Sequence, residues 1–169
     1  MKSKLLPSIV LGSICLVVAL LLAVVNGITQ PMIEEAQAQK VQDSLAEVLP
    51  SGKNFIEIST EGLTSSVTAA YTEDGGGYVF RLEVTGYKSG LVIMCGINPN
   101  GTVAGADFIA SSETLSAEVG LGDKYVGQNA ESFSPELITS ATKTSQAYAD
   151  AIKAALDSYR ILAERRDAQ

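Results

Sequence analysis

The chain opens with a long apolar segment and then changes to alternating polar and apolar positions. From Leu5 to Val25 almost every residue is apolar, and no charged residue occurs between Lys4 and Glu34. A helix of that length spans the ~30 Å hydrocarbon core of a membrane. The pattern therefore predicts one transmembrane helix over residues 5–27, in contact with the lipid bilayer.

The flanking charges predict how this helix is oriented. Two lysines, Lys2 and Lys4, precede the segment, whereas the first two charges after it are acidic. The positive-inside rule places residues 1–4 in the cytoplasm and the rest of the chain outside, after a single pass through the cell membrane. A cleaved signal peptide ending near Val25-Asn26-Gly27 is the alternative, but its apolar core would be unusually long.

Residues 28–50 are expected to connect the span to a domain through an amphipathic helix. The helical part runs from about Met32 to Val48, and Pro50-Ser51-Gly52 ends it. Apolar residues recur along it at approximately helical spacing, namely Ile33, Ala36, Val41, Leu45, Val48 and Leu49. One side of this helix should therefore pack on the domain or on a partner.

The middle of the chain has the pattern of short strands. In residues 78–84 one set of alternate positions is apolar and the other includes Arg81 and Glu83, as in a half-buried strand. The wholly apolar residues 91–95 fit a central strand, and Gly-rich and Asn-Pro turn signals separate the segments. The expected strands are Phe55–Ser59, Val67–Tyr71, Tyr78–Val84, Leu91–Ile97 and Val103–Ile109.

A last helix is expected from about Thr144 to Ala163. Its apolar side consists of Ala147, Ile152, Ala155, Leu156, Tyr159 and Leu162. Together these elements predict an α+β domain over residues 51–169, in which a twisted, mainly antiparallel sheet is flanked by helices.

The composition excludes several kinds of catalytic and metal site. The chain has no histidine, which excludes Ser-His-Asp catalysis, His-ligated haem and ordinary zinc sites. Its two cysteines, Cys15 in the apolar segment and Cys95 in a strand, are too few for an iron–sulfur cluster. A net charge of −7 argues against nucleic acid as a partner. An electron carrier of this composition needs an organic cofactor.

A run of small and hydroxyl residues before the last helix is the candidate site. Residues 139–145 could simply be a capped helix start, with Thr144 or Ser145 as the N-cap. The same place suits a phosphate, because a helix N-terminus presents unpaired N–H groups and the positive end of the helix dipole. Lys143 would add a positive charge, and the two hydroxyls could donate hydrogen bonds.

This run resembles a family motif, in which an acidic residue, two variable positions and Ser or Thr precede Gly-Ala-Thr, often followed by one residue and Thr-Ser. The chain matches it at Glu136, Thr139, Ala141 and Thr142, and continues with Lys143-Thr144-Ser145. The family is that of the G subunit of the Rnf complex and the C subunit of the sodium-pumping NADH:quinone reductase. The resemblance extends over nearly the whole chain, including the pair Gly86-Tyr87 and the N-terminal helix that ends in Leu49-Pro50.

The resemblance implies that the phosphate of FMN is esterified to Thr142. The residues around that phosphate would be Thr139, Ser140, Ala141, Lys143 and Thr144. The chain departs from the family at Ser140, where glycine is usual. If that position has a positive φ, the serine is strained by about 1 kcal/mol or more.

A second segment resembles the family's Glu-Thr-Pro-Gly-Leu-Gly loop, which lies beside the flavin. Here Glu113-Thr114 is separated from Gly120-Leu121-Gly122 by residues 115–119, and the proline is missing. The resemblance implies that Glu113, Thr114, Leu121 and Gly122 line the flavin ring. The alternative is a glycine-containing loop with no ligand.

The function implied by the resemblance is electron transfer through covalently bound FMN in an Rnf-type complex. Such complexes couple electron flow between reduced ferredoxin and NAD to sodium or proton transport. The partners would be the other membrane and redox subunits of the complex and, during maturation, a flavin transferase. The alternatives are the C subunit of the quinone reductase and a membrane-anchored binding or assembly domain without a cofactor.

The orientation of the expected span can be tested by proteolysis. Protease added to intact cells, once any outer barrier is opened, should remove everything after Asn26, because the lysines before the span hold the N-terminus inside. Protection equal to that of a cytoplasmic control protein would refute this orientation.

Overall fold

The computed structural model describes residues 2–113 and 119–167. The chain divides into two units, residues 1–40 and 41–169. The first unit is formed by helix α1 (Lys2–Val48) up to Lys40. This helix is continuous in secondary structure, so the helices expected over residues 5–27 and from Met32 to Val48 are one element.

The apolar part of α1 is open to its surroundings. Leu11, Leu16 and Leu22 each expose more than 60% of their surface. Within the described residues, however, no helix meets the combined requirement of length and apolar character for crossing a membrane. The span expected over residues 5–27 is therefore not confirmed and stays a prediction from the sequence.

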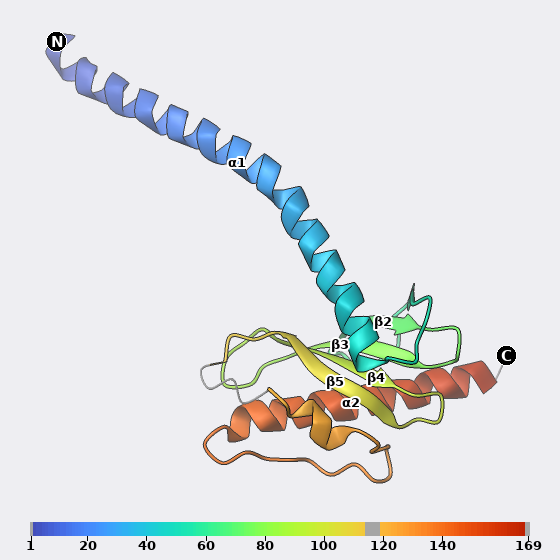
Figure 1. Ribbon diagram of the computed structural model, residues 1–169. Coiled ribbons are helices and arrows are strands. Elements are labelled where there is room, and N and C mark those ends of the chain that lie inside the picture. Colours follow the sequence, from blue (N-terminus) through green and yellow to red (C-terminus); the bar gives the residue numbers. More distant parts are fainter. Residues whose placement is uncertain (1, 114–118, 168–169) are drawn as a thin grey trace. The chain divides into compact units, whose positions relative to one another are not determined.

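The second unit is built on a five-stranded antiparallel sheet in which each strand pairs with the next along the chain (Figure 1). The strands are β1 (Ile56–Ile58), β2 (Val67–Thr72), β3 (Tyr78–Val84), β4 (Leu91–Ile97) and β5 (Val103–Ala110). All five expected strands are confirmed to within one residue at each end. The expected α+β class is confirmed as well.

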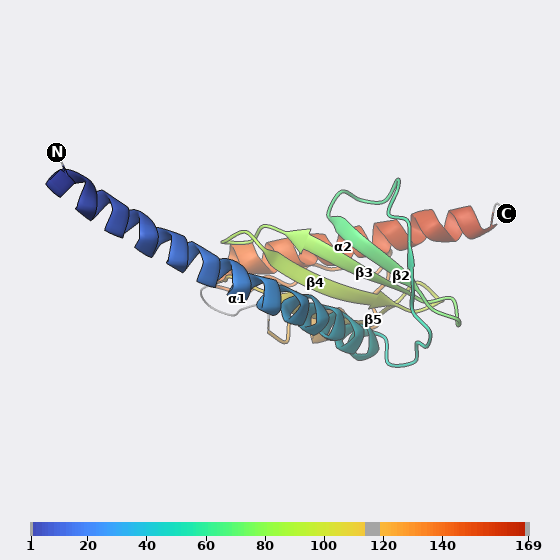
Figure 2. The same ribbon diagram turned by 90° about the horizontal axis from the view of Figure 1, so that it is seen from above.

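Helix α2 (Thr142–Asp167) covers one face of the sheet and packs against β3 and β4 (Figure 2). The alternation seen in the sequence of β3 turns Phe80 and Leu82 toward this face. They meet Tyr148, Ile152 and Ala155 of α2, all of which are fully buried. Burial of this apolar surface is the main favourable contribution to folding.

The last two turns of α1 pack on the opposite face of the sheet. Leu45, Val48 and Leu49 form a separate apolar cluster with Val79 and Met94. The helix end comes so close because two strand positions lack side chains. A Cβ at Gly96 would lie 2.3 Å from the carbonyl oxygen of Val48, and a Cβ at Gly105 would lie 2.9 Å from it.

The short helix η1 (Gly122–Tyr125) closes the outer edge of β5. A Cβ on Gly122 would lie 1.6 Å from the carbonyl oxygen of Ala106, so only glycine fits. Next to it, the ring of Tyr125 stacks between those of Phe133 and Tyr148, with centroid distances of 5.9 and 6.1 Å. This aromatic column joins η1 and the following loop to α2.

Two titratable groups are enclosed in the core beneath α2. Burial raises the pKa of the Cys95 thiol to about 12, which makes this cysteine unreactive at neutral pH. Burial also raises the pKa of Tyr148, whose hydroxyl has no hydrogen-bond partner among the residues that the structure describes. A buried hydroxyl without a partner lowers the stability of a fold.

Replacing Tyr148 by phenylalanine should therefore stabilise the protein. The variant Tyr148→Phe keeps the aromatic stack and removes the unpaired hydroxyl, so the free energy of unfolding should rise by about 1 kcal/mol. Urea unfolding of the variant and the parent chain measures this. A loss of similar size would mean that the hydroxyl is bonded in solution.

Candidate functional site

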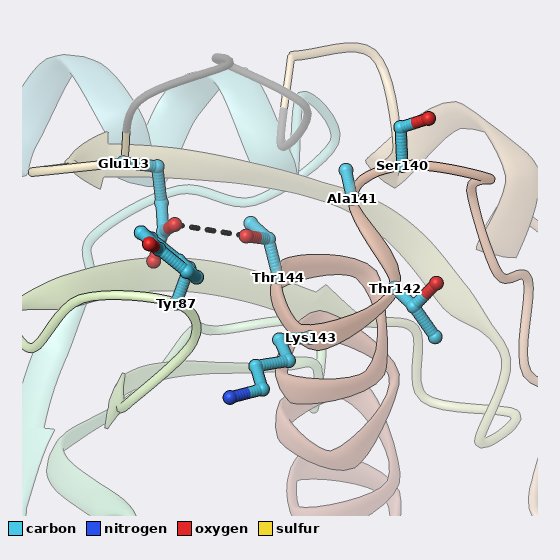
Figure 3. A pocket seen from close by; sticks show the side chains of 7 residues that line it. All are labelled: Tyr87, Glu113, Ser140, Ala141, Thr142, Lys143 and Thr144. Atoms are coloured by element: carbon cyan, nitrogen blue, oxygen red, sulfur yellow. Dashed lines mark hydrogen bonds between the residues drawn. The ribbon is translucent and has the colours of Figure 1, made fainter.

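A pocket of about 510 Å³ lies at the N-terminus of α2. Three segments that are far apart in the sequence form it: the turn between β3 and β4, the segment that follows β5, and the start of α2. Its lining residues are Tyr87, Glu113, Ser140, Ala141, Thr142, Lys143 and Thr144 (Figure 3). Six of these seven residues were predicted from the sequence as ligands of a cofactor.

Glu113 lies at the point where the three segments meet. Its Oε2 accepts a hydrogen bond of 2.8 Å from the hydroxyl of Thr144, drawn as a dashed line in Figure 3. Its Oε1 accepts a bond of 3.1 Å from the backbone N–H of Lys88. A Cβ at Gly86 would lie 2.5 Å from Oε1, so a side chain at this position would displace the carboxylate.

Helix α2 begins at Thr142, two residues earlier than expected. Thr144 and Ser145 are therefore not N-caps but belong to the first turn, which corrects the prediction. The hydroxyl of Ser145 instead accepts a hydrogen bond of 3.0 Å from the N–H of Ile138 and thereby ties the preceding loop to the helix. The amides of Thr142, Lys143 and Thr144 are those that an α-helix leaves without an intrahelical partner.

Ser140 has a left-handed backbone conformation, the case in which strain is expected from the sequence at this position. Its φ is +72°, so the serine occupies a region that favours glycine. The conformation turns the chain sharply into α2 and brings Ala141 and Thr142 to the pocket. Because the Cβ remains, the site carries backbone strain at this residue.

Thr142 and Lys143 expose their side chains at the mouth of the pocket. The hydroxyl of Thr142 points away from Glu113 in Figure 3 and donates to the carbonyl oxygen of Ile138 at 3.4 Å, near the limit for a hydrogen bond. Little free energy is lost when this hydroxyl leaves its partner. The hydroxyl is exposed and free to turn toward another group.

A second hollow, of about 610 Å³, lies next to Thr142 and Lys143 and is also lined by them. Its lining includes the carboxylates of Glu83 and Asp150. Two acidic side chains disfavour an anionic ligand there. Among the described residues that line the first pocket, Glu113 is the one acidic side chain, and both of its carboxylate oxygens already accept hydrogen bonds.

Three other predicted ligands, Thr139, Leu121 and Gly122, do not line the first pocket. Thr139 is exposed beside it. Leu121 is 1% exposed and belongs to the core, and Gly122 lies against β5. The structure thus does not bring Leu121 and Gly122 to this pocket, because Leu121 packs in the core and Gly122 packs against the edge of β5. Thr114 lies outside the described residues.

Tyr87 is the lining residue that was not predicted from the sequence. The residue is 67% exposed and forms part of the pocket wall that faces α2. The only signal in the sequence was the pair Gly86-Tyr87, which belonged to the resemblance but carried no role. An exposed aromatic ring beside a pocket offers a flat apolar surface for a planar ligand.

Comparison with known families agrees with this geometry. Residues 86–157 match the family model of the FMN-binding domain, and residues 2–48 match that of the RnfG N-terminal region. All the residues that line the first pocket fall within the first match. The chain thus carries an FMN-binding domain.

Two curated relatives identify the family. Each is the G subunit of an ion-translocating oxidoreductase complex, from one of two strains of Cereibacter sphaeroides, and each is 30% identical over 132 residues. The alignment covers 73% of this chain and 58% of each relative, so the chain spans little more than half of their length. The chain belongs to the RnfG family.

The strain at Ser140 can be tested by substitution. Ser140→Gly should raise the free energy of unfolding of the ligand-free protein by about 1 kcal/mol, because glycine adopts positive φ without a steric cost. Ser140→Ala is the matched control, since it removes the hydroxyl but keeps the Cβ, and it should give no such gain. Equal stabilities of the two variants in thermal unfolding would contradict the assignment.

Proposed function

We propose that this chain is an electron-carrying subunit of an ion-translocating oxidoreductase complex, and that its carrier is FMN esterified to Thr142. The observation that carries the proposal is the position of Thr142. It is the first residue of α2, it is exposed, and it lines a pocket that falls within the FMN-binding domain. The name of the two relatives supports membership of a complex of this kind.

The start of α2 provides the binding groups for the phosphate of FMN. The unpaired amides of the first turn and the positive end of the helix dipole favour an anion at this place. The N-cap position falls on Ala141, whose side chain cannot cap the helix, so the phosphate would satisfy donors that the chain leaves open. Lys143 adds a full positive charge at the same end.

The rest of the pocket suits the ring system of the flavin. Tyr87 offers an aromatic face at one wall. At the opposite wall the side chain of Ala141 is small and leaves room for the ring. When bound, FMN supplies an organic centre that accepts and releases single electrons, and the chain's own residues bind and orient it. No cluster of possible metal ligands occurs in the described part of the chain, and the proposed role requires none.

The attachment of FMN requires a co-substrate and an enzyme. A flavin transferase would use FAD, and the Thr142 oxygen would form a bond to the phosphorus of the FMN half. The bond from that phosphorus to the bridging oxygen breaks, AMP leaves, and the hydroxyl proton is released. The exposure of Thr142 and the weakness of its hydrogen bond suit it to this reaction.

The N-terminal part of the proposal is an anchor in the cell membrane. The apolar segment from Leu5 to Val25, its flanking charges and the match of residues 2–48 to the RnfG N-terminal region support it. The FMN-binding domain would then lie outside the cytoplasm and contact the other subunits. Electron transfer between ferredoxin and NAD, coupled to sodium or proton transport, belongs to the same proposal.

Covalent attachment is tested by mass spectrometry. The chain, co-expressed with a flavin transferase, should gain the mass of FMN minus water on the peptide that contains Thr142. Thr142→Val should abolish this adduct, because valine has nearly the same shape but no hydroxyl. Thr139→Val is the matched control and should keep the adduct, since Thr139 is exposed nearby but does not line the pocket.

A full adduct on Thr142→Val would exclude Thr142 as the attachment residue. A parent chain that stays colourless and unmodified would instead support a cofactor-free binding or assembly domain.

A further inference from the structure

The carboxylate of Glu113 makes two hydrogen bonds that join separate walls of the pocket. The N–H of Lys88 belongs to the turn that carries Tyr87, and the hydroxyl of Thr144 belongs to the turn of α2 that carries Thr142. Together these two hydrogen bonds form the Glu113 bridge. Each carboxylate oxygen of Glu113 thus accepts a hydrogen bond from within the chain, and each can accept fewer hydrogen bonds from a ligand.

The surroundings of the Glu113 bridge fix it in place. Thr144 is 4% exposed, so its side chain has little freedom to turn away. The N–H of Glu113 donates to the hydroxyl of Ser111 at 3.0 Å, which orders the chain between β5 and the pocket. Gly86 lies beneath the carboxylate, and a Cβ there would also lie 3.2 Å from the Cα of Thr144.

The side chain of Glu113 is the acceptor in both bonds of the bridge. The Lys88 amide can only donate, and Thr144 donates its hydroxyl proton to the other oxygen. Hydrogen bonds to an ionised acceptor are stronger than those between neutral groups. The carboxylate also lies at the N-terminal turn of α2, where the helix dipole stabilises negative charge.

We propose that Glu113 is a positioning residue, and that the Glu113 bridge sets the separation between the wall of Tyr87 and the wall of Thr142. This inference rests on the proposed function, because the two walls matter as the two sides of the flavin site. Glu113 then acts on the flavin through Lys88 and Thr144, rather than as a direct ligand of the ring.

Hydrogen exchange at the Lys88 amide tests the bridge without any cofactor. Glu113→Ala should accelerate this exchange by roughly ten-fold or more in the full chain in detergent, because the amide loses its acceptor. Glu113→Gln should preserve most of the protection, since its amide oxygen accepts from Lys88 while its NH₂ group donates to Thr144. Glu131→Ala removes an exposed acidic side chain on the loop before α2 and should change nothing.

Substitutions at the far end of the bridge distinguish a bridge from two independent bonds. Thr144→Val cuts the bond to α2, so it should accelerate exchange at Lys88 as well, although Lys88 itself is untouched. Unchanged exchange at Lys88 in Thr144→Val would show that the two walls are not coupled, and the proposal would fall.

The consequence for the flavin is measured separately. In chains that carry FMN, the fluorescence anisotropy of Glu113→Ala should decay faster than that of the parent, because the ring moves in a wider site. Glu113→Gln should resemble the parent. Faster exchange at Lys88 without any change in flavin mobility would refute the positioning role. If the parent chain takes up no flavin, the proposed function fails, whereas the exchange data still decide whether the bridge exists.

Discussion

The packing of α2 against the sheet is the interaction on which the candidate site depends. Tyr148, Ile152 and Ala155 are fully buried against the strands, so α2 cannot slide or turn without opening the core. This packing fixes the level at which the helix begins. The first-turn amides and Thr142 therefore lie at a defined place beside the β3–β4 turn. The free energy that holds them there comes from the apolar surface about two to four turns further along the helix.

The fold could be predicted because its signals are local. The alternation in β3, the apolar run in β4 and the turn residues between them each lie within a few positions, and they predicted all five strands. The first residue of α2 was missed by two positions for a different reason. Thr144 and Ser145 are good N-cap residues, but Ser145 bonds to Ile138 in the preceding loop, and Thr144 bonds to Glu113, 31 residues away, which only the tertiary structure brings near.

The site was predicted only in part, because its residues come from segments that are distant in the sequence. The residues from Ser140 to Thr144 are contiguous, so one motif was enough to select them. Tyr87 could not be selected in this way, since its role appears only when the β3–β4 turn meets the start of α2. Leu121 was assigned to the ring by its neighbours in the sequence, whereas burial assigns it to the core. The roles of Gly86 and Gly122 could not be predicted from the sequence either. They become visible only from the atoms of distant residues that a Cβ at these positions would contact.

The position of Tyr87 has a consequence for the optical properties of the protein. The chain contains no tryptophan, so its intrinsic ultraviolet emission comes from six tyrosines. Tyr125 and Tyr148 are enclosed in the core, whereas Tyr87 is the tyrosine that lines the pocket. A flavin in that pocket absorbs at the wavelengths at which tyrosine emits and would quench Tyr87 by energy transfer. The chain therefore contains its own spectroscopic reporter of whether the pocket is filled.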